Sequence, residues 1–146
     1  MTFISKTVEV HANAATILGI VMDFEAYPQW NPEVTGVWIL HHYDDGRPSQ
    51  LKLQASYGGF EGSFIQAIYY PNPTQIRTIL QQGDLFRKQE QIFSVVELSS
   101  DTTLLTVDLE IELDRAMPNL MIKKAANDTL GYLADNLKRR AEQLTT

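Results

Sequence analysis

A chain of 146 residues, 44% of them apolar, is long enough to bury one sizeable core and too short for two comfortable domains, so we expect a single domain over residues 1–146. With 18 acidic and 12 basic residues, the formal net charge of −6 repels phosphate backbones, which argues against nucleic acid as a partner. The longest apolar run, from Ile17 to Met22, is far shorter than the roughly 20 apolar residues that span a bilayer, so no membrane span is expected.

The N-terminal residues give no sign of export. Residues 1–6 lack the basic start, the apolar stretch and the small-residue cleavage site of a secretory signal. The chain also has no cysteine with which to form disulfides. We therefore expect a cytoplasmic location.

The first elements are expected to be a strand and then a helix. Residues 3–10 alternate in polarity and are rich in β-branched side chains, which is typical of a strand. Asn13 follows as a suitable N-cap for the apolar stretch Ala14–Met22, which predicts a helix.

A second, short helix is expected directly after the first. Asp23 can cap it, and it should cover residues 24–26. It must end before Tyr27, because Pro28 disfavours helical geometry in the residue that precedes it. Asp23 and Glu25 suit capping and compensation of the helix dipole better than paired acid/base catalysis.

Six β-rich runs follow from Glu33 onward and are separated by short turns. Because short turns join antiparallel neighbours, these six runs predict an antiparallel sheet. The turns are Asp44–Gly46, Gly58–Gly59, Pro71–Pro73, Gln82–Asp84 and Ser99–Asp101.

The last segment has the periodicity of one long amphipathic helix. Pro118 suits the start of such a helix, which would have roughly seven turns. Gly131 interrupts it, which indicates either a closely packed neighbour, the interpretation that we favour, or a pocket beside the helix. Apolar residues recur at spacings of three and four and define one stripe: Ala126, Leu130, Leu133, Leu137, Ala141 and Leu144.

The glycine pair Gly58–Gly59 allows the two faces of one hairpin to be predicted. If it forms a two-residue loop, Tyr57 lies opposite Phe60, and residues two apart along each strand share a face. One face then carries Lys52, Gln54, Ser56, Glu61 and Ser63 and meets water. The other is expected to face the core and carries Leu51, Leu53, Ala55, Tyr57, Phe60, Gly62, Phe64, Gln66, Ile68 and Tyr70.

The last two strands differ in how clearly their faces can be assigned. In the final strand, odd-numbered residues from Thr103 to Leu113 should be buried. The preceding strand, residues 85–98, is polar at its centre in both registers. A two- or four-residue loop around Ser99 would turn Lys88 and Glu90 inward, and a five-residue loop would turn Arg87, Gln89 and Gln91 inward.

One segment resembles a known superfamily. Residues 23–34 read Asp-Phe-Glu-Ala-Tyr-Pro-Gln-Trp-Asn-Pro-Glu-Val, and they are similar to the segment after the first helix in the polyketide cyclase/dehydrase and lipid-transport superfamily, the START-like or Bet v 1-like proteins. Pro118 and the segment Leu137–Glu142 strengthen the resemblance. It implies the α+β helix-grip fold, in which a curved seven-stranded antiparallel sheet surrounds a long C-terminal helix and two short helices follow the first strand.

The resemblance also implies a cavity between sheet and helix that holds an apolar small molecule. Residues 1–146 would form one START-like ligand-binding domain. The contacts that we expect in the cavity are Trp30, Leu53, Tyr57, Phe64, Gln66, Glu90 and Leu130.

Gln66 and Trp30 each fit more than one role. Gln66 is a buried amide on the core face and needs partners, either a ligand or Tyr70, Tyr57 or a buried water. Trp30, like Tyr27, lies beside prolines and either covers one end of the cavity or belongs to the ordinary core.

Signals for a metal, a cofactor or a nucleophile are missing from the sequence. His41 and His42 are adjacent, so in a strand they point to opposite faces and cannot chelate one metal, and His11 lies alone. The sequence contains no Gly-x-Ser-x-Gly, no phosphate-binding glycine loop and no His-Glu-x-x-His. We therefore expect no metal and no cofactor.

Three functions fit these features. The leading one is binding of a hydrophobic small molecule, for transport or sequestration. The second is a polyketide cyclase, aromatase or dehydratase with Glu90 or Lys88 as the acid/base group. The third is an interaction module with a protein partner, because some relatives resemble coenzyme Q-binding proteins or ribosome-directed toxins. The sequence does not decide whether a reaction is catalysed.

Overall fold

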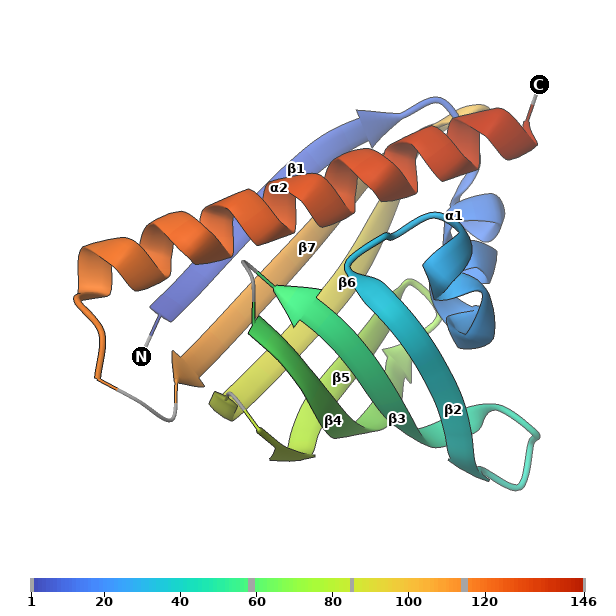
Figure 1. Ribbon diagram of the computed structural model, residues 1–146. Coiled ribbons are helices and arrows are strands. Elements are labelled where there is room, and N and C mark those ends of the chain that lie inside the picture. The colour runs from blue at the N-terminus through green and yellow to red at the C-terminus, as the bar shows by residue number, and fades with distance from the viewer. Residues whose placement is uncertain (1, 58–59, 85, 114–115, 146) are drawn as a thin grey trace.

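The computed structural model describes residues 2–57, 60–84, 86–113 and 116–145. Within these residues the chain forms seven strands, two α-helices and one short 3-10 helix (Figure 1). In chain order they are β1 (Thr2–Val10), α1 (Ala14–Met22), η1 (Phe24–Gln29), β2 (Val34–His42), β3 (Pro48–Tyr57), β4 (Phe60–Asn72), β5 (Gln75–Gly83), β6 (Phe86–Ser99), β7 (Thr102–Leu113) and α2 (Asn119–Leu144).

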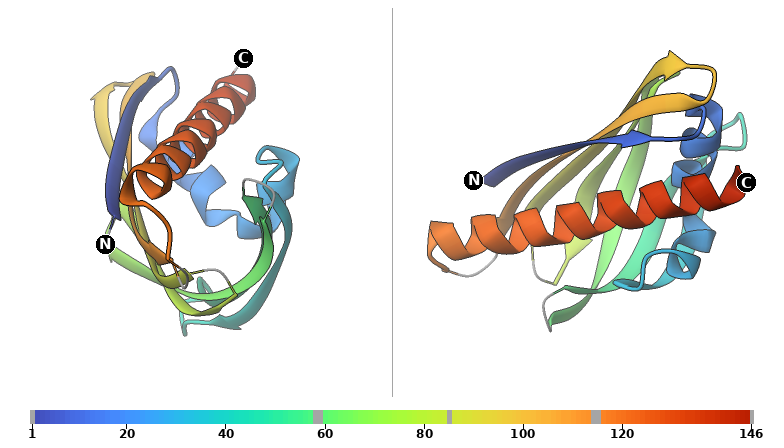
Figure 2. Two further views of the ribbon diagram at one scale, coloured as in Figure 1. Left: turned by 60° about the vertical axis from the view of Figure 1, so that its left-hand side comes forward. Right: turned by 90° about the horizontal axis from the view of Figure 1, so that it is seen from above.

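The strands form one antiparallel sheet in the order β1-β7-β6-β5-β4-β3-β2. Strands β2 to β7 follow one another as hairpins, as their short turns predict, and β1 pairs with β7. The sheet curves, and α2 lies across its concave side (Figure 2). The predicted helix-grip fold is confirmed. None of the described helices is both long enough and apolar enough to cross a membrane.

The predicted core face of the β3–β4 hairpin is confirmed where the structure describes it. Tyr57 pairs with Phe60, so every second residue along both strands faces the core. The loop 58–59 and the side chains of Tyr57 and Phe60 lie outside the described part of the chain. Buried side chains on the predicted core face are Leu51, Leu53, Ala55, Phe64, Gln66 and Ile68.

Helix α1 begins as the sequence predicts, but η1 is longer than expected. The Asn13 side chain accepts a hydrogen bond from the backbone N–H of Thr16 at 2.8 Å, which caps α1. Asp23 makes no capping bond, and η1 continues through Pro28 to Gln29. The predicted end before Tyr27 is wrong, because η1 is a 3-10 helix. The Ala26 N–H donates to the Asp23 carbonyl and the Trp30 N–H donates to the Tyr27 carbonyl, so no bond needs the N–H that Pro28 lacks.

The inward face of β6 is set by two bulges. Ser99 pairs with Thr102, so the loop between β6 and β7 has two residues. That loop alone would turn Lys88 and Glu90 inward, but the register shifts between Glu97 and Ser99, and this bulge reverses which side chains of β6 face inward. Gln89 is therefore buried, whereas Lys88 and Glu90 lie on the other face. The inward face predicted from a five-residue loop is correct for Gln89 and Gln91, which line the cavity, and wrong for Arg87. A second shift between Phe86 and Lys88 turns the Arg87 side chain outward, where it is 65% exposed.

Helix α2 is buried along most of its predicted stripe. Pro118 precedes its first residue, and the Pro118 carbonyl accepts hydrogen bonds from Met121 and Ile122. Buried stripe residues run from Ala126 to Ala141, whereas Leu144 in the last turn is exposed. The predicted close packing of a neighbouring element at Gly131 is wrong, because a Cβ built there would meet no atom of another element within 4 Å.

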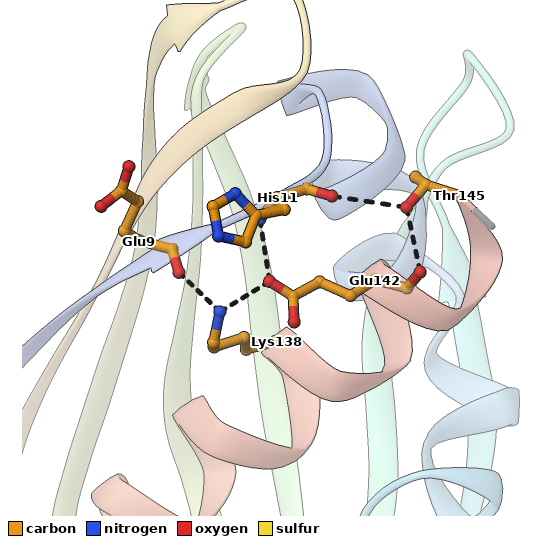
Figure 3. Close-up of polar contacts among 5 residues, drawn as sticks. All are labelled: Glu9, His11, Lys138, Glu142 and Thr145. Atoms are coloured by element: carbon orange, nitrogen blue, oxygen red, sulfur yellow. Dashed lines mark hydrogen bonds and ion pairs between the residues drawn. The ribbon is translucent and has the colours of Figure 1, made fainter.

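Polar contacts fasten the C-terminal end of α2 to the end of β1 (Figure 3). Glu142 Oε2 accepts bonds from the His11 backbone N–H at 2.9 Å and from Lys138 Nζ at 2.6 Å. Lys138 Nζ also donates to the Glu9 carbonyl at 2.9 Å, and the Thr145 hydroxyl donates to the His11 carbonyl at 3.3 Å. We call these five residues the C-terminal clamp.

The clamp predicts a pH-dependent contribution to stability from Glu142. The hydrogen bond from Lys138 and then that from the His11 backbone hold the pKa of the Glu142 carboxyl below its ordinary value of 4.5. A lowered folded-state pKa gives stability that is present in full above pH 4.5 and is lost as the pH falls through the folded-state value. At pH 7, Glu142→Gln should reduce the free energy of unfolding by about 1 kcal/mol, because partial exposure screens the pair.

Urea unfolding at pH 7 and pH 3 measures this contribution, with the exposed Glu25→Gln as a control of equal charge change. The difference between wild type and Glu142→Gln should shrink at pH 3. An equal difference at both pH values would contradict the role of the carboxylate.

Candidate ligand-binding cavity

A cavity of about 830 Å³ lies between the concave face of the sheet and α2. It exists because α2 packs on β1 and β7, at one side of the curved sheet, while η1 packs on β2 at the other side. Strands β3 to β6 lie between these two packed sides of the sheet, and side chains on their concave faces line the cavity. Figure 2 shows the sheet curving away beneath α2 toward β2.

The cavity wall is largely apolar. Strand alternation turns every second side chain of the sheet toward the cavity, and α2 contributes the first part of the predicted stripe, Ala126, Leu130 and Leu133. The apolar lining residues are Phe24, Val34, Leu53, Phe86, Phe93, Leu109, Ile111, Leu113, Met117, Met121, Ile122, Ala125, Ala126, Leu130 and Leu133. A wall of this kind favours transfer of apolar surface from water, at about 25 cal/mol per Å².

Four neutral polar side chains on β4, β5 and β6 interrupt the apolar wall. We call Gln66, Thr78, Gln89 and Gln91 the polar floor; all four line the cavity, and the first three are buried, with exposures of 6, 5 and 7%. Gln66 Nε2 donates to Gln89 Oε1 at 2.9 Å, and Thr78 lies opposite Gln91 in the sheet. Among the described residues, Gln66 Oε1, Gln89 Nε2 and the side chains of Thr78 and Gln91 make no further hydrogen bond.

Two carboxylates stand where the cavity opens to solvent. Glu33 is half-buried and Asp128 is exposed, and we call this pair the acidic rim. The Glu33 backbone is held by the Asn31 side chain, which accepts its N–H, and by Ser56, whose N–H donates to its carbonyl at 2.7 Å. Burial raises the pKa of the Glu33 carboxyl, and no described residue bonds to that carboxylate.

The structure brings three of the predicted contact residues to the cavity wall. Leu53, Gln66 and Leu130 line it. Gln66 finds its partner in Gln89, rather than in Tyr70, whose hydroxyl donates to the Pro48 carbonyl.

Two further predicted contacts are buried but lie behind the wall. The Phe64 ring packs against that of Phe86 at 5.5 Å between centroids, and Phe86 lines the cavity. Trp30 packs against the lining residue Tyr27 at 4.9 Å. Both are core aromatics that support lining residues.

The predicted cavity contact at Glu90 is wrong. The Glu90 carboxylate lies 2.7 Å from Arg77 Nε, on the sheet face opposite Gln89, because the bulge between Glu97 and Ser99 inverts the face of β6. The side chain of Tyr57 lies outside the described residues.

Sequence reasoning missed several lining residues. Thr78 could have been found from alternation with the buried Ile76 on β5. Glu33 and Asp128 carried no signal, because they come from segments far apart in the sequence, one after η1 and one in α2, that both line the cavity. Ser56, expected on the wet face, also reaches the cavity.

The described cavity residues are suited to binding and do not assemble a nucleophile or a metal site. No group of three metal-ligating side chains occurs among the described residues, and the described lining includes no histidine, lysine or arginine. Burial strongly raises the pKa of the Tyr27 phenol, whose hydroxyl donates to the Val21 carbonyl at 2.7 Å. That phenol is a buried structural group in the cavity wall.

Known proteins share this sequence pattern and this fold. A family model described as polyketide cyclase/dehydrase and lipid transport matches residues 10–138. A START superfamily protein from Mycobacterium smegmatis is 58% identical, with a TM-score of 0.95 over 97% of this chain and 98% of that one. No sequence among the curated proteins gives a match.

More distant structures share the fold alone. The ZhuI aromatase/cyclase from Streptomyces sp. R1128 has a TM-score of 0.86 at 13% identity, covering 99% of this chain and 96% of that one. The major latex-like protein 151 from Panax ginseng has a TM-score of 0.72 at 11% identity, covering 96% and 97%. At these identities neither structure identifies a ligand or an activity.

The polar floor predicts coupling between Gln66 and Gln89. Gln66→Met removes the donor of a buried hydrogen bond and should lower the free energy of unfolding by about 1–3 kcal/mol. The double variant Gln66→Met/Gln89→Met should cost less than the sum of the single variants by about 1 kcal/mol, because no amide is then left without its partner. Urea unfolding of the four proteins measures this, with the exposed Gln54→Met as a control. Strictly additive costs would contradict the pairing.

Proposed function

Because the chain belongs to the polyketide cyclase/dehydrase and lipid transport family and to the START superfamily, we propose that it binds an apolar small molecule between its sheet and α2. The cavity of about 830 Å³ carries this proposal. Its volume falls within the roughly 300–1,000 Å³ typical of small-molecule sites, and its lining combines many apolar side chains with a few convergent polar ones. Binding of this kind would serve transport or sequestration.

The depth of the cavity supports binding over a surface contact. Lining residues such as Leu130, Phe93 and Leu53 are almost fully buried, so a ligand that touches them leaves water. Each 100 Å² of apolar ligand surface buried there contributes about 2.5 kcal/mol before the cost of association. Specificity then falls to the polar floor and the acidic rim.

A cyclase or dehydratase is not favoured over binding by the described residues. Its two acid/base candidates lie on the outer face of the sheet, Glu90 beside Arg77 at 2.7 Å and Lys88 beside Glu110 at 3.7 Å. A general acid or base must lie within hydrogen-bonding reach of the reacting group, and neither residue lines the cavity.

A cavity-filling substitution tests the binding site directly. Ala126 is buried, lines the cavity and lies on α2, so Ala126→Trp should occupy part of the space that a ligand needs. Wild-type protein freed of co-purified molecules should take up Nile red, an uncharged apolar dye, at one molecule per chain. Ala126→Trp should weaken this uptake at least about tenfold, or about 1.4 kcal/mol.

The neighbouring Asn127→Trp is the matched control, since Asn127 is exposed on the same helix turn and does not line the cavity. Fluorescence titration compares the three proteins, and circular dichroism establishes that each is folded. Equal affinity in Ala126→Trp and wild type, or no uptake by wild type, would contradict binding in this cavity.

A further inference from the structure

The charged side chains that line the cavity are all of one sign in the part of the chain that the structure describes. Glu33 and Asp128 of the acidic rim are the charged side chains among the described lining residues, which include no lysine, arginine or histidine. No ion pair neutralises either carboxylate among the described residues. A ligand that enters the cavity therefore passes two uncompensated negative charges.

The inner end of the cavity offers no compensation for a buried negative charge. The polar floor consists of amides and a hydroxyl, which are neutral and can donate and accept hydrogen bonds. Gln66 Oε1 and Gln89 Nε2 provide one acceptor and one donor without a described partner. A carboxylate placed there would lose its hydration without gaining a cation, which is a costly transfer, whereas a carbonyl or hydroxyl group would be satisfied.

The opposite orientation of an anionic ligand is also unfavourable. With its tail inside and its carboxylate at the opening, the ligand would place a like charge beside Glu33. Because Glu33 is half-buried, water and salt screen this repulsion less than they would on an open surface. Asp128 is exposed and should repel more weakly.

From these contacts we infer that the acidic rim is a specificity determinant that excludes anionic ligands. The ligand is an uncharged apolar molecule with a carbonyl or hydroxyl group that hydrogen-bonds to the polar floor. This inference rests on the proposed binding function and specifies its ligand class. Glu33 supplies most of the exclusion and Asp128 a smaller part.

Two probes that differ only in charge test the inference. One is 11-(dansylamino)undecanoic acid and the other is its primary amide, which has the same fluorophore and chain length. Fluorescence titration at pH 8, well above the ordinary pKa of a carboxyl, gives the affinity of each. The wild-type protein should bind the amide at least about tenfold more tightly than the acid.

Substitutions at the rim should change the affinity for the acid alone. Glu33→Gln should bring the affinity for the acid to within about threefold of that for the amide, and Asp128→Asn should have a smaller effect in the same direction. Glu25→Gln is the control: it removes the same charge from an exposed position on η1 that does not line the cavity, and it should leave the ratio unchanged. Thermal unfolding checks that all variants are folded.

The possible failures are distinguishable. Equal affinity of wild type for acid and amide, or an unchanged ratio in Glu33→Gln, would overturn the charge selection while binding itself stands. An equal change in Glu25→Gln would assign the effect to net charge and would also overturn it. Failure of both probes and of Nile red to bind would overturn the proposed function and, with it, this inference.

Discussion

The structure depends on a mismatch between the curved sheet and the single helix packed against it. Helix α2 packs on β1 and β7, while β3 to β6 continue the concave face beyond it, and apolar side chains line both sides of the space that is left. The same alternation that gives each strand one apolar face therefore creates the apolar wall of a cavity. A core with native packing density would fill such a space with side chains. Here a ligand of suitable shape can fill it instead.

The placement of α2 shapes the opening of this cavity. Its C-terminal half is buried in the core and is joined to β1 by the C-terminal clamp, with Lys138 and Glu142 at the centre. Its N-terminal turns are far less covered, with Leu120 80% exposed. Those N-terminal turns and the segment that follows η1 line the cavity. The clamp holds the C-terminal end of α2, so the N-terminal end is the part of the helix that defines where a ligand enters.

Much of the fold could be predicted from the sequence, because its strongest signals are local. The glycine pair at 58–59 predicts the Tyr57–Phe60 register that the structure has, and with it the buried faces of β3 and β4; the stripe from Ala126 to Ala141 predicts the buried face of α2. The inward face of β6 could not be fixed, because bulges near Arg87 and Leu98 change its register without a sequence signature. For that reason the sequence places Glu90 among the expected cavity contacts. In the structure, Gln89 and Gln91 line the cavity instead. The acidic rim depends on packing between distant segments, which no local pattern reveals.

We propose that this cavity holds an uncharged apolar molecule, and native mass spectrometry of freshly purified protein decides whether it does. We expect either a complex of one chain with one small molecule, identified after denaturing extraction as apolar and uncharged, or an unliganded chain that takes up one added sterol or aromatic polyketide. A bare chain mass, with every such compound failing to bind, would contradict it.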